Sequence, residues 1–183
     1  MQVASDRGRR VVDANLERDP VNQTAPDTEH ERFMRQVIEL ARQNIRNGRG
    51  GPFAAAVVKD GIIIARGTNQ VTSLNDPTAH AEVIAIREAC RVLGSFQLSG
   101  CDIYTSCEPC PMCLGAIYWA RPVSVYFAAT REDAAAAGFD DSFIYDEFAR
   151  AIDSRKIPMT QVLREEARGV FTAWEKDERK VMY

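Results

Sequence analysis

The sequence of 183 residues lacks several features by which other classes of protein are identified. No window holds about 18 consecutive apolar residues, the minimum for a membrane-spanning helix. Lys and Arg total 23 against 26 Asp and Glu, so the excess of positive charge typical of polynucleotide-binding proteins is missing. Residues 1–20 include an arginine pair but no apolar stretch after it, unlike a signal peptide. We therefore expect a cytoplasmic protein that acts on a small molecule, with neither a membrane nor a nucleic acid as partner.

The five cysteines are an odd number, and three of them, Cys107, Cys110 and Cys113, fall within seven residues. Disulfide frameworks of small secreted proteins use even sets of more widely spaced cysteines. The clustering therefore favours reduced thiols that serve as metal ligands. Cys90, expected within a helix, and Cys101, expected at the start of a strand, are interpreted as buried small apolar residues.

The chain length fits one compact domain. Residues 1–28 mix both charge signs with polar residues and show no sustained periodicity, so we predict a flexible N-terminal arm followed by a single domain over residues 29–183. Residues 130–155 read as helix or loop. Periodicity and turn signals predict helices over 29–47, 75–94, 110–120 and 164–180, a hairpin over 53–69 turning at Asp60-Gly61, and strands over 101–106, 123–129 and 157–163.

Helices and strands that alternate after an initial hairpin are typical of an α/β fold. The pattern predicts a three-layer α/β/α sandwich around a five-stranded mixed sheet. The long connection between the strands at 123–129 and 157–163 suits a parallel crossover. The helix over 110–120 must bury one face, so we expect Tyr118 and Trp119 in the core.

Two short segments carry residues that bind metals. Thr78 to Glu82 reads T-A-H-A-E, and residues 108–113 read E-P-C-P-M-C. Catalytic zinc takes three protein ligands and keeps a fourth position for water, so His80, Cys110 and Cys113 are the candidate ligands. Glu82, two residues after the histidine, is the candidate proton shuttle. Both segments lie at expected helix starts, where the positive end of the helix dipole favours thiolates, and the pattern H-x-E with P-C-x-x-C is a signature of zinc nucleobase deaminases.

The same residues allow other interpretations. The repeat of Cys107, Cys110 and Cys113 resembles part of an iron–sulfur motif, but such a motif needs a further cysteine shortly afterwards, where this chain has Ile117. A C-x-x-C pair can also be redox-active. A structural zinc needs a fourth ligand, for which Cys107 is the nearest thiol and His30 the only other histidine. A structural zinc would give Glu82 no role in proton transfer, so the sequence favours catalytic zinc.

From about residue 30 to its end the chain resembles the cytidine deaminase superfamily, and within it the bacterial guanine deaminases. The resemblance covers GGPF at 50–53, NDPTAHAEV at 75–83, YTSCEPCPMCLGAIYWARP at 104–122 and AGFDDSFIY at 137–145. It implies a cytidine deaminase-like fold, one Zn²⁺ per subunit, and hydrolysis of guanine to xanthine and ammonia.

The resemblance also implies roles for residues outside the metal motif. Asn69 and the backbone of Ala81 would hold the polar edge of the purine, and Phe53 would pack on its ring. Asp141 would accept a hydrogen bond from the imidazole edge. The C-terminal segment would be exchanged between the subunits of a homodimer, so that Tyr183 closes the partner's site. From one sequence, such packing in trans remains an implication of the family.

Other functions stay open at this stage. The same machinery could deaminate guanosine, cytosine or an adenosine in transfer RNA, although the acidic charge balance disfavours RNA. A hypothesis of a different class is a structural metal-binding module, which predicts a metal with no open coordination position.

Overall fold

The structure is a computed structural model that describes residues 27–183. The predicted arm over residues 1–28 therefore lies outside the described residues, apart from its last two. In the described part of the chain no helix is long and apolar enough to cross a membrane. The elements are, in chain order, α1 (Glu29–Arg46), β1 (Ala54–Lys59), β2 (Ile62–Thr68), α2 (Val71–Leu74), α3 (Ala81–Leu93), β3 (Cys101–Cys107), α4 (Pro111–Ala120), β4 (Ser124–Ala129), α5 (Arg131–Ala136), α6 (Ser142–Ala149), the 3₁₀ turn η1 (Ile152–Ser154) and α7 (Arg164–Lys176).

Four strands form one mixed sheet in the order β2-β1-β3-β4. β1 is antiparallel to both neighbours, whereas β3 and β4 are parallel. The two-residue turn between β1 and β2 places Asp60 at φ 50° and Gly61 at φ 73°, the pair of positive angles that a type I′ hairpin requires. The hairpin predicted from the Asp-Gly pair is confirmed.

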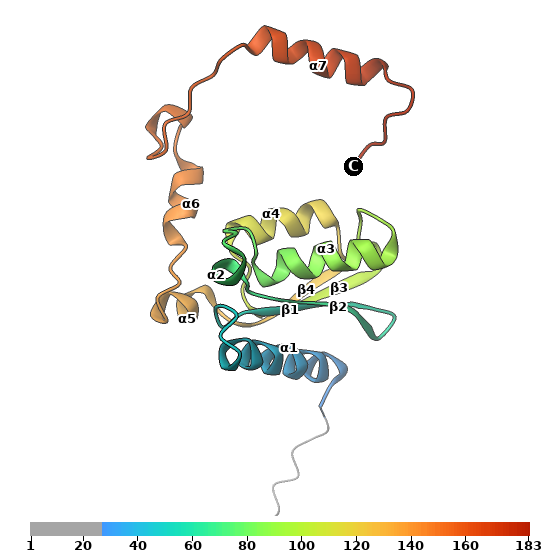
Figure 1. Cartoon of the computed structure of the whole chain (residues 1–183), viewed down its shortest axis with the longest axis vertical. Coiled ribbons are helices and arrows are strands. Elements are labelled where there is room, and N and C mark those ends of the chain that lie inside the picture. The colour runs from blue at the N-terminus through green and yellow to red at the C-terminus, as the bar shows by residue number, and fades with distance from the viewer. Residues whose placement is uncertain (1–26) are drawn as a thin grey trace, which may run out of the picture.

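β1 is buried on both faces, which explains its continuous apolar sequence. Ala54, Ala56 and Val58 belong to a core cluster with Phe33 and Val37 of α1. The alternate residues of β1, Ala55 and Val57, belong to a second cluster on the opposite face of the sheet. That cluster also contains Ile103 of β3, Ala81, Ala85 and Ala89 of α3, and Ile117 of α4. The sheet therefore lies between α1 on one side and α3 with α4 on the other (Figure 1), which is the predicted three-layer sandwich.

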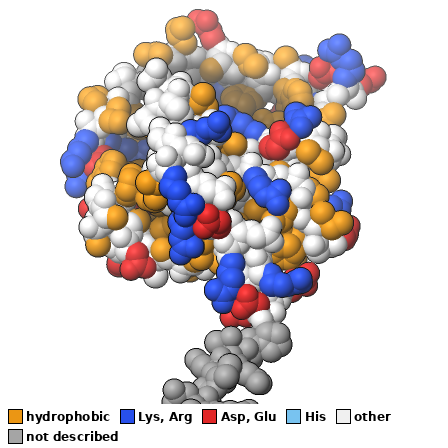
Figure 2. All heavy atoms as spheres, turned by 60° about the horizontal axis from the view of Figure 1, so that its bottom comes forward, with side chains coloured by type: hydrophobic (Ala, Val, Ile, Leu, Met, Phe, Trp, Pro, Cys, Tyr) orange, Lys and Arg blue, Asp and Glu red, His pale blue; other side chains and the backbone are white. Residues whose placement is uncertain are grey.

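The outer face of the α1 layer is polar and carries both signs of charge. Figure 2 shows Lys and Arg side chains interspersed with Asp and Glu on this face of the molecule. Exposed charges pair along α1, as in Arg32 with Glu29 and Arg42 with Glu39. Such exposed pairs contribute little to stability.

The C-terminal third of the chain departs from the prediction. Residues 157–163, expected as a fifth strand, form no strand, so the sheet has four strands and not five. The expected parallel crossover from β4 to this segment is accordingly wrong. α6 leads away from the sandwich, and α7 lies beyond α3 and α4 (Figure 1). The C-terminal segment, defined here as residues 148–183, carries many apolar side chains that are exposed in the single chain. They are Phe148, Ile152, Ile157, Met159, Val162, Leu163, Val170, Phe171, Val181 and Met182.

The expectation that Tyr118 and Trp119 lie in the core is also wrong. α4 is apolar around most of its circumference, but only one side of it faces the sheet, where Cys113, Ile117 and Ala120 are buried. Tyr118 and Trp119 are on the other side and are 75% and 64% exposed. The outer face of α4 and the C-terminal segment thus both leave apolar side chains exposed in the single chain.

Candidate metal centre and its pocket

Two helix starts meet at one point of the structure. His80 is the N-cap residue of α3, and Cys110 is the N-cap residue of α4, with Pro111 in the first turn. The Nδ1 atom of His80 lies 3.6 Å from Sγ of Cys110 and 3.5 Å from Sγ of Cys113. The three candidate ligand atoms all lie within 4.8 Å of one another, so the structure brings the predicted ligands together.

Close packing of α3 on the sheet fixes the position of His80. A Cβ atom on Gly67 of β2 would lie 2.1 Å from the carbonyl oxygen of Ala81 and 2.7 Å from the amide nitrogen of Ala85. Only glycine allows the first turn of α3 to approach the strand this closely. The helix begins at Ala81, later than the sequence pattern indicated, because Asp76 accepts hydrogen bonds from the amide and hydroxyl of Thr78 in the preceding turn.

The chemistry of the three donors suits a zinc ion. All the cysteines are free thiols. A hydrogen bond from Cys113 lowers the pKa of Cys110 to about 4, and the shared proton raises the pKa of Cys113. The hydrogen bond with Cys110 likewise raises the pKa of His80. A negative sulfur, a second sulfur and an imidazole at contact distance form a site for a cation, and one nitrogen with two sulfurs is a donor set that zinc accepts.

Glu82 lies in the first turn of α3 beside these ligands and is only 7% exposed. Burial raises the pKa of its carboxyl above the ordinary value of a glutamate. The side chain nevertheless lines the same cavity as His80 and Cys110. Glu82 is therefore a carboxyl group that is shielded from bulk water but open to a bound molecule.

The two alternative ligands considered from the sequence have other contacts, although Cys107 also lines the cavity described below. Cys107 ends β3, and its sulfur contacts the carbonyl oxygen of Thr130 at 3.4 Å. Burial raises the pKa of this thiol to about 11, which keeps it protonated at neutral pH. His30 is on α1, across the sheet, where its Nδ1 atom hydrogen-bonds the hydroxyl of Tyr104 at 2.7 Å. Neither residue joins the group formed by His80, Cys110 and Cys113.

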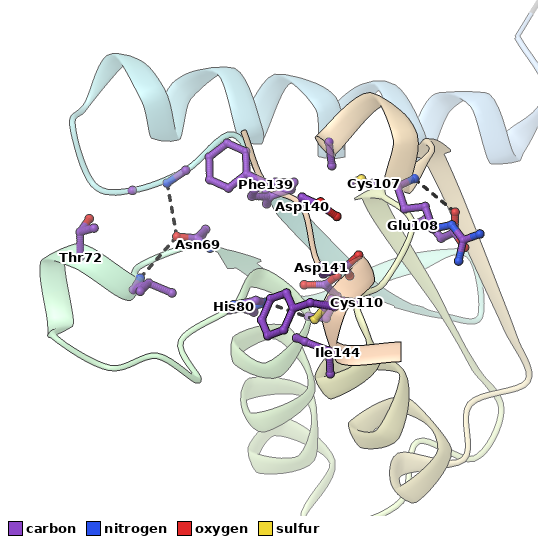
Figure 3. Close-up of a pocket in the computed structure, with 18 of the residues that line it drawn as sticks. Asn69, Thr72, His80, Cys107, Glu108, Cys110, Phe139, Asp140, Asp141 and Ile144 are labelled. Atoms are coloured by element: carbon purple, nitrogen blue, oxygen red, sulfur yellow. Dashed lines mark hydrogen bonds between the residues drawn. The ribbon is translucent and has the colours of Figure 1, made fainter. Parts of the chain in front are cut away.

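A cavity of about 630 Å³ opens above the three ligands. Phe53, Asn69 and Asp141, which the resemblance assigned to substrate binding, line it. Figure 3 labels Asn69 and Asp141 among the residues around the cavity. Ala81 is fully buried at the start of α3 and does not line the cavity. Tyr183 does not line this cavity in its own chain, because its ring packs against Trp119 of α4 with centroids 5.8 Å apart.

The side-chain amide of Asn69 has a defined orientation. Its Oδ1 atom accepts hydrogen bonds from the backbone amides of Gly51 at 3.3 Å and Val71 at 3.4 Å. Asn44 of α1, which the sequence reasoning missed, is buried and donates from Nδ2 to the carbonyl oxygens of Gly51 at 2.9 Å and Asn69 at 2.8 Å. Because Oδ1 of Asn69 is occupied, its Nδ2 group is left as a hydrogen-bond donor.

An aromatic wall covers one side of the cavity. The rings of Phe53 and Phe139 meet edge to face with centroids 4.9 Å apart. Phe143 and Ile144 of α6 continue this wall, and partial burial raises the pKa of Asp141 in the same segment. Phe139, Phe143 and Ile144 had no role predicted from the sequence, although all three lie in the AGFDDSFIY stretch that carries the resemblance.

Comparisons with known proteins agree with this geometry. The cytidine and deoxycytidylate deaminase zinc-binding region matches residues 27–129, more than half of the chain. Guanine deaminase of Bacillus subtilis (strain 168) is 57% identical over 154 residues, which are 84% of this chain and 99% of that protein. An X-ray structure of guanine deaminase from Bacillus subtilis superimposes with a TM-score of 0.82 at 57% identity and covers 84% of this chain and 98% of that one.

A tRNA-specific adenosine deaminase of the same organism is 33% identical over 153 residues, which are 84% of this chain and 92% of that protein. The match to the zinc-binding region includes His80, Glu82, Cys110 and Cys113, the residues that the structure gathers below the cavity. The chain therefore belongs to the cytidine and deoxycytidylate deaminase family.

Proposed function

We propose that this chain hydrolyses guanine to xanthine and ammonia. The observation that carries the proposal is a cavity of about 630 Å³, large enough for a purine, with three zinc-compatible donors beside a buried carboxyl group. Sequence identity to known deaminases supports guanine over a nucleic acid as the substrate. Over nearly the same length, the chain is 57% identical to a guanine deaminase and 33% identical to a tRNA-specific adenosine deaminase.

Glu82 is the proton carrier of the proposed reaction. Zinc bound by His80, Cys110 and Cys113 would supply Lewis acidity that makes a water molecule a better nucleophile at neutral pH. Glu82 accepts a proton from the water that attacks C2 of guanine and delivers it to the adjacent ring nitrogen. A second proton, from the hydroxyl group now bound to C2, passes through Glu82 to the exocyclic amino group, and the bond between C2 and that nitrogen breaks to release ammonia. The buried position of Glu82 favours this role, because a raised pKa brings a carboxyl group closer to neutral pH.

The proposed substrate contacts combine groups that line the cavity with the Ala81 amide, which the family resemblance assigns to the substrate. Asn69 donates from Nδ2 to an acceptor of the purine, and the amide of Ala81 is one of the first-turn donors that a helix leaves without an internal partner. Phe53 packs against the ring from the aromatic wall. Asp141 accepts from the N–H of the imidazole ring. These contacts suit a free base whose polar edges are all available.

Parallel rate measurements on guanine, guanosine, cytosine and adenine test this substrate assignment. We expect ammonia release from guanine to be faster than from cytosine or adenine by at least about 10⁴-fold, because a site that pairs with particular polar groups strongly rejects analogues that lack them. Faster release from cytosine or adenine would overturn the assignment. A higher rate with guanosine would move the assignment to the nucleoside while keeping the mechanism.

We further propose that the functional form is a homodimer in which the C-terminal segments are exchanged. Two apolar surfaces of the single chain support this proposal. One is the outer face of α4 with Tyr118 and Trp119, and the other is the segment around α7, in which Val170 and Phe171 are each 69% exposed. Many large apolar side chains exposed on two parts of one chain are typical of subunit interfaces. Cytoplasmic location stays a prediction from the sequence.

Deletion of Tyr183 tests whether the C-terminus closes a catalytic site. We expect the KM for guanine to rise or kcat to fall by about tenfold, with zinc content unchanged, because the loss of a large aromatic contact costs about 1–2 kcal/mol of binding. Steady-state kinetics and metal analysis measure both effects. An unaffected enzyme would show that the terminus does not close the site.

Mixed dimers separate closure in trans from closure in cis. A chain carrying Glu82→Gln retains Tyr183, and a chain lacking Tyr183 retains Glu82. If the segments are exchanged, the mixed dimer formed by co-expression contains one complete site and recovers normal KM at that site. If each C-terminus closes the site of its own chain, no site of the mixed dimer has both Glu82 and Tyr183, and the normal KM is not recovered.

A further inference from the structure

A buried hydroxyl group lies beside Glu82 at a position where the sheet is otherwise apolar. Thr105 is on β3, and its neighbours on the same side of the strand, Cys101 and Ile103, belong to the apolar cluster between the sheet and α3. Thr105 itself is 2% exposed. Among residues 27–183 only four polar or charged side chains are buried, and three of them, Asn69, Glu82 and Asn44, line the cavity or hold its wall. The fourth is Thr105.

The contacts of this hydroxyl connect the strand to the carboxyl group. Its Oγ1 atom lies 3.4 Å from Oε1 of Glu82 and 2.9 Å from the carbonyl oxygen of Cys107. A hydroxyl has one proton to donate and two lone pairs that accept. When the hydroxyl donates its proton to the carbonyl oxygen of Cys107, it can accept a hydrogen bond from a protonated Glu82. When its proton points to Glu82, it donates a hydrogen bond to the carboxylate. It can therefore hold Oε1 whether or not Glu82 carries a proton.

From this geometry we propose that Thr105 is a positioning residue for Glu82, a role that rests on the function proposed above. The hydroxyl holds Oε1 against β3, which is fixed on both sides by β1 and β4. Oε2 is then the oxygen that transfers protons in the cavity. A carboxyl group without this contact can rotate about its last side-chain bond, since such terminal torsions are broad. Misplacement of a reacting group by about 1 Å can slow a reaction by about a hundredfold.

The matched variants are Thr105→Val and Thr105→Ser. Valine keeps the branched shape and the strand preference of threonine but has no hydroxyl, whereas serine keeps the hydroxyl. We expect Thr105→Val to lower kcat for guanine by about ten- to a hundredfold, with zinc content kept and KM changed by less than about twofold. Thr105→Ser should restore kcat to within about threefold of the parent enzyme. If Thr105→Val keeps normal kcat, raises KM alone or loses zinc, or if serine does no better than valine, the proposal is wrong.

Ser106→Ala controls for the removal of any strand hydroxyl. Ser106 is the next residue of β3, and its Oγ accepts from the amide of Ala54 at 3.0 Å without contacting Glu82. Its loss should lower the temperature of unfolding but leave kcat within about twofold. A fall in kcat equal to that of Thr105→Val would assign the effect to the strand and would overturn the role of Thr105.

Crystal structures of the two Thr105 variants keep the test independent of the substrate. We expect the carboxyl group of Glu82 to rotate or occupy several conformers in Thr105→Val and to stay in place in Thr105→Ser. If guanine is not the substrate, this result still stands, and the kinetics are repeated with the base or nucleoside that the parent enzyme turns over. An unmoved carboxyl group in Thr105→Val would refute the proposal whatever the substrate.

Discussion

Replacement of Glu82 by glutamine is expected to abolish turnover while zinc and fold are retained. Glutamine has the shape of glutamate, and its amide can still hydrogen-bond the hydroxyl of Thr105, which lies 3.4 Å from the carboxyl group. The amide cannot take a proton from water and pass it to the substrate. Because general acid–base catalysis contributes about 10²–10⁴-fold, and Glu82 handles both proton transfers, the loss in kcat should reach at least about 10⁴-fold. Ammonia release, zinc content and thermal unfolding measure the three expectations.

Glu88→Gln is the matched control for this variant. Glu88 lies on the same helix but on its exposed side, where it pairs with Arg91 at 2.6 Å. Exposed pairs of this kind contribute little, so both kcat and stability should stay close to those of the parent protein. Normal activity of Glu82→Gln would make the proposed mechanism wrong. Loss of zinc together with activity would instead give Glu82 a structural role at the metal.

The metal centre was predictable because its residues are local in sequence and each half of the motif has a local structural cause. His80 and Cys110 both end a loop at the start of a helix, and proline after Cys110 is favoured in a first turn. Residues two apart cannot converge from the middle of a helix. The motif H-x-E therefore indicates that the metal lies at a helix N-terminus. The N-termini of α3 and α4 together form the metal centre.

The surroundings of the cavity were less predictable because they depend on contacts between distant segments. Asn44 acts on Asn69 from 25 positions away, and Thr105 reaches Glu82 across 23. Asparagine in a helix and threonine in a strand are ordinary in their own elements, so neither position carries a local signal. Only the packing of α1 and β3 against the cavity gives these side chains their partners.

The two wrong expectations about apolar residues have one physical origin. A periodic apolar pattern indicates that a side chain is buried, but it does not indicate which chain buries it. Tyr118 was expected in the core and residues 157–163 in the sheet, whereas the single chain leaves both largely exposed. An exchanged dimer would cover them without changing the sequence pattern.

Replacement of Cys113 by alanine is expected to remove both zinc and turnover. Cys113 is fully buried, and its sulfur lies 3.5 Å from Nδ1 of His80. Alanine leaves one nitrogen and one sulfur, too few donors for a stable catalytic zinc site. Because the loss of an outer-sphere partner alone weakens zinc binding by about 10–100-fold, the loss of a ligand should weaken it by more than about a hundredfold. Metal analysis after dialysis, ammonia release and thermal unfolding record the result.

Two other cysteines make this experiment decisive between a catalytic and a structural metal. Cys101→Ala also removes a fully buried sulfur, but from the apolar cluster beneath α3, so it should lower stability and keep zinc. Cys107→Ala tests the fourth position, because a structural zinc would need this thiol as its last ligand. Zinc retained in Cys107→Ala and lost in Cys113→Ala leaves one coordination position for water, as deamination requires. Zinc lost from both variants would mean a closed four-ligand site, and retention in Cys113→Ala would remove that cysteine from the ligand set.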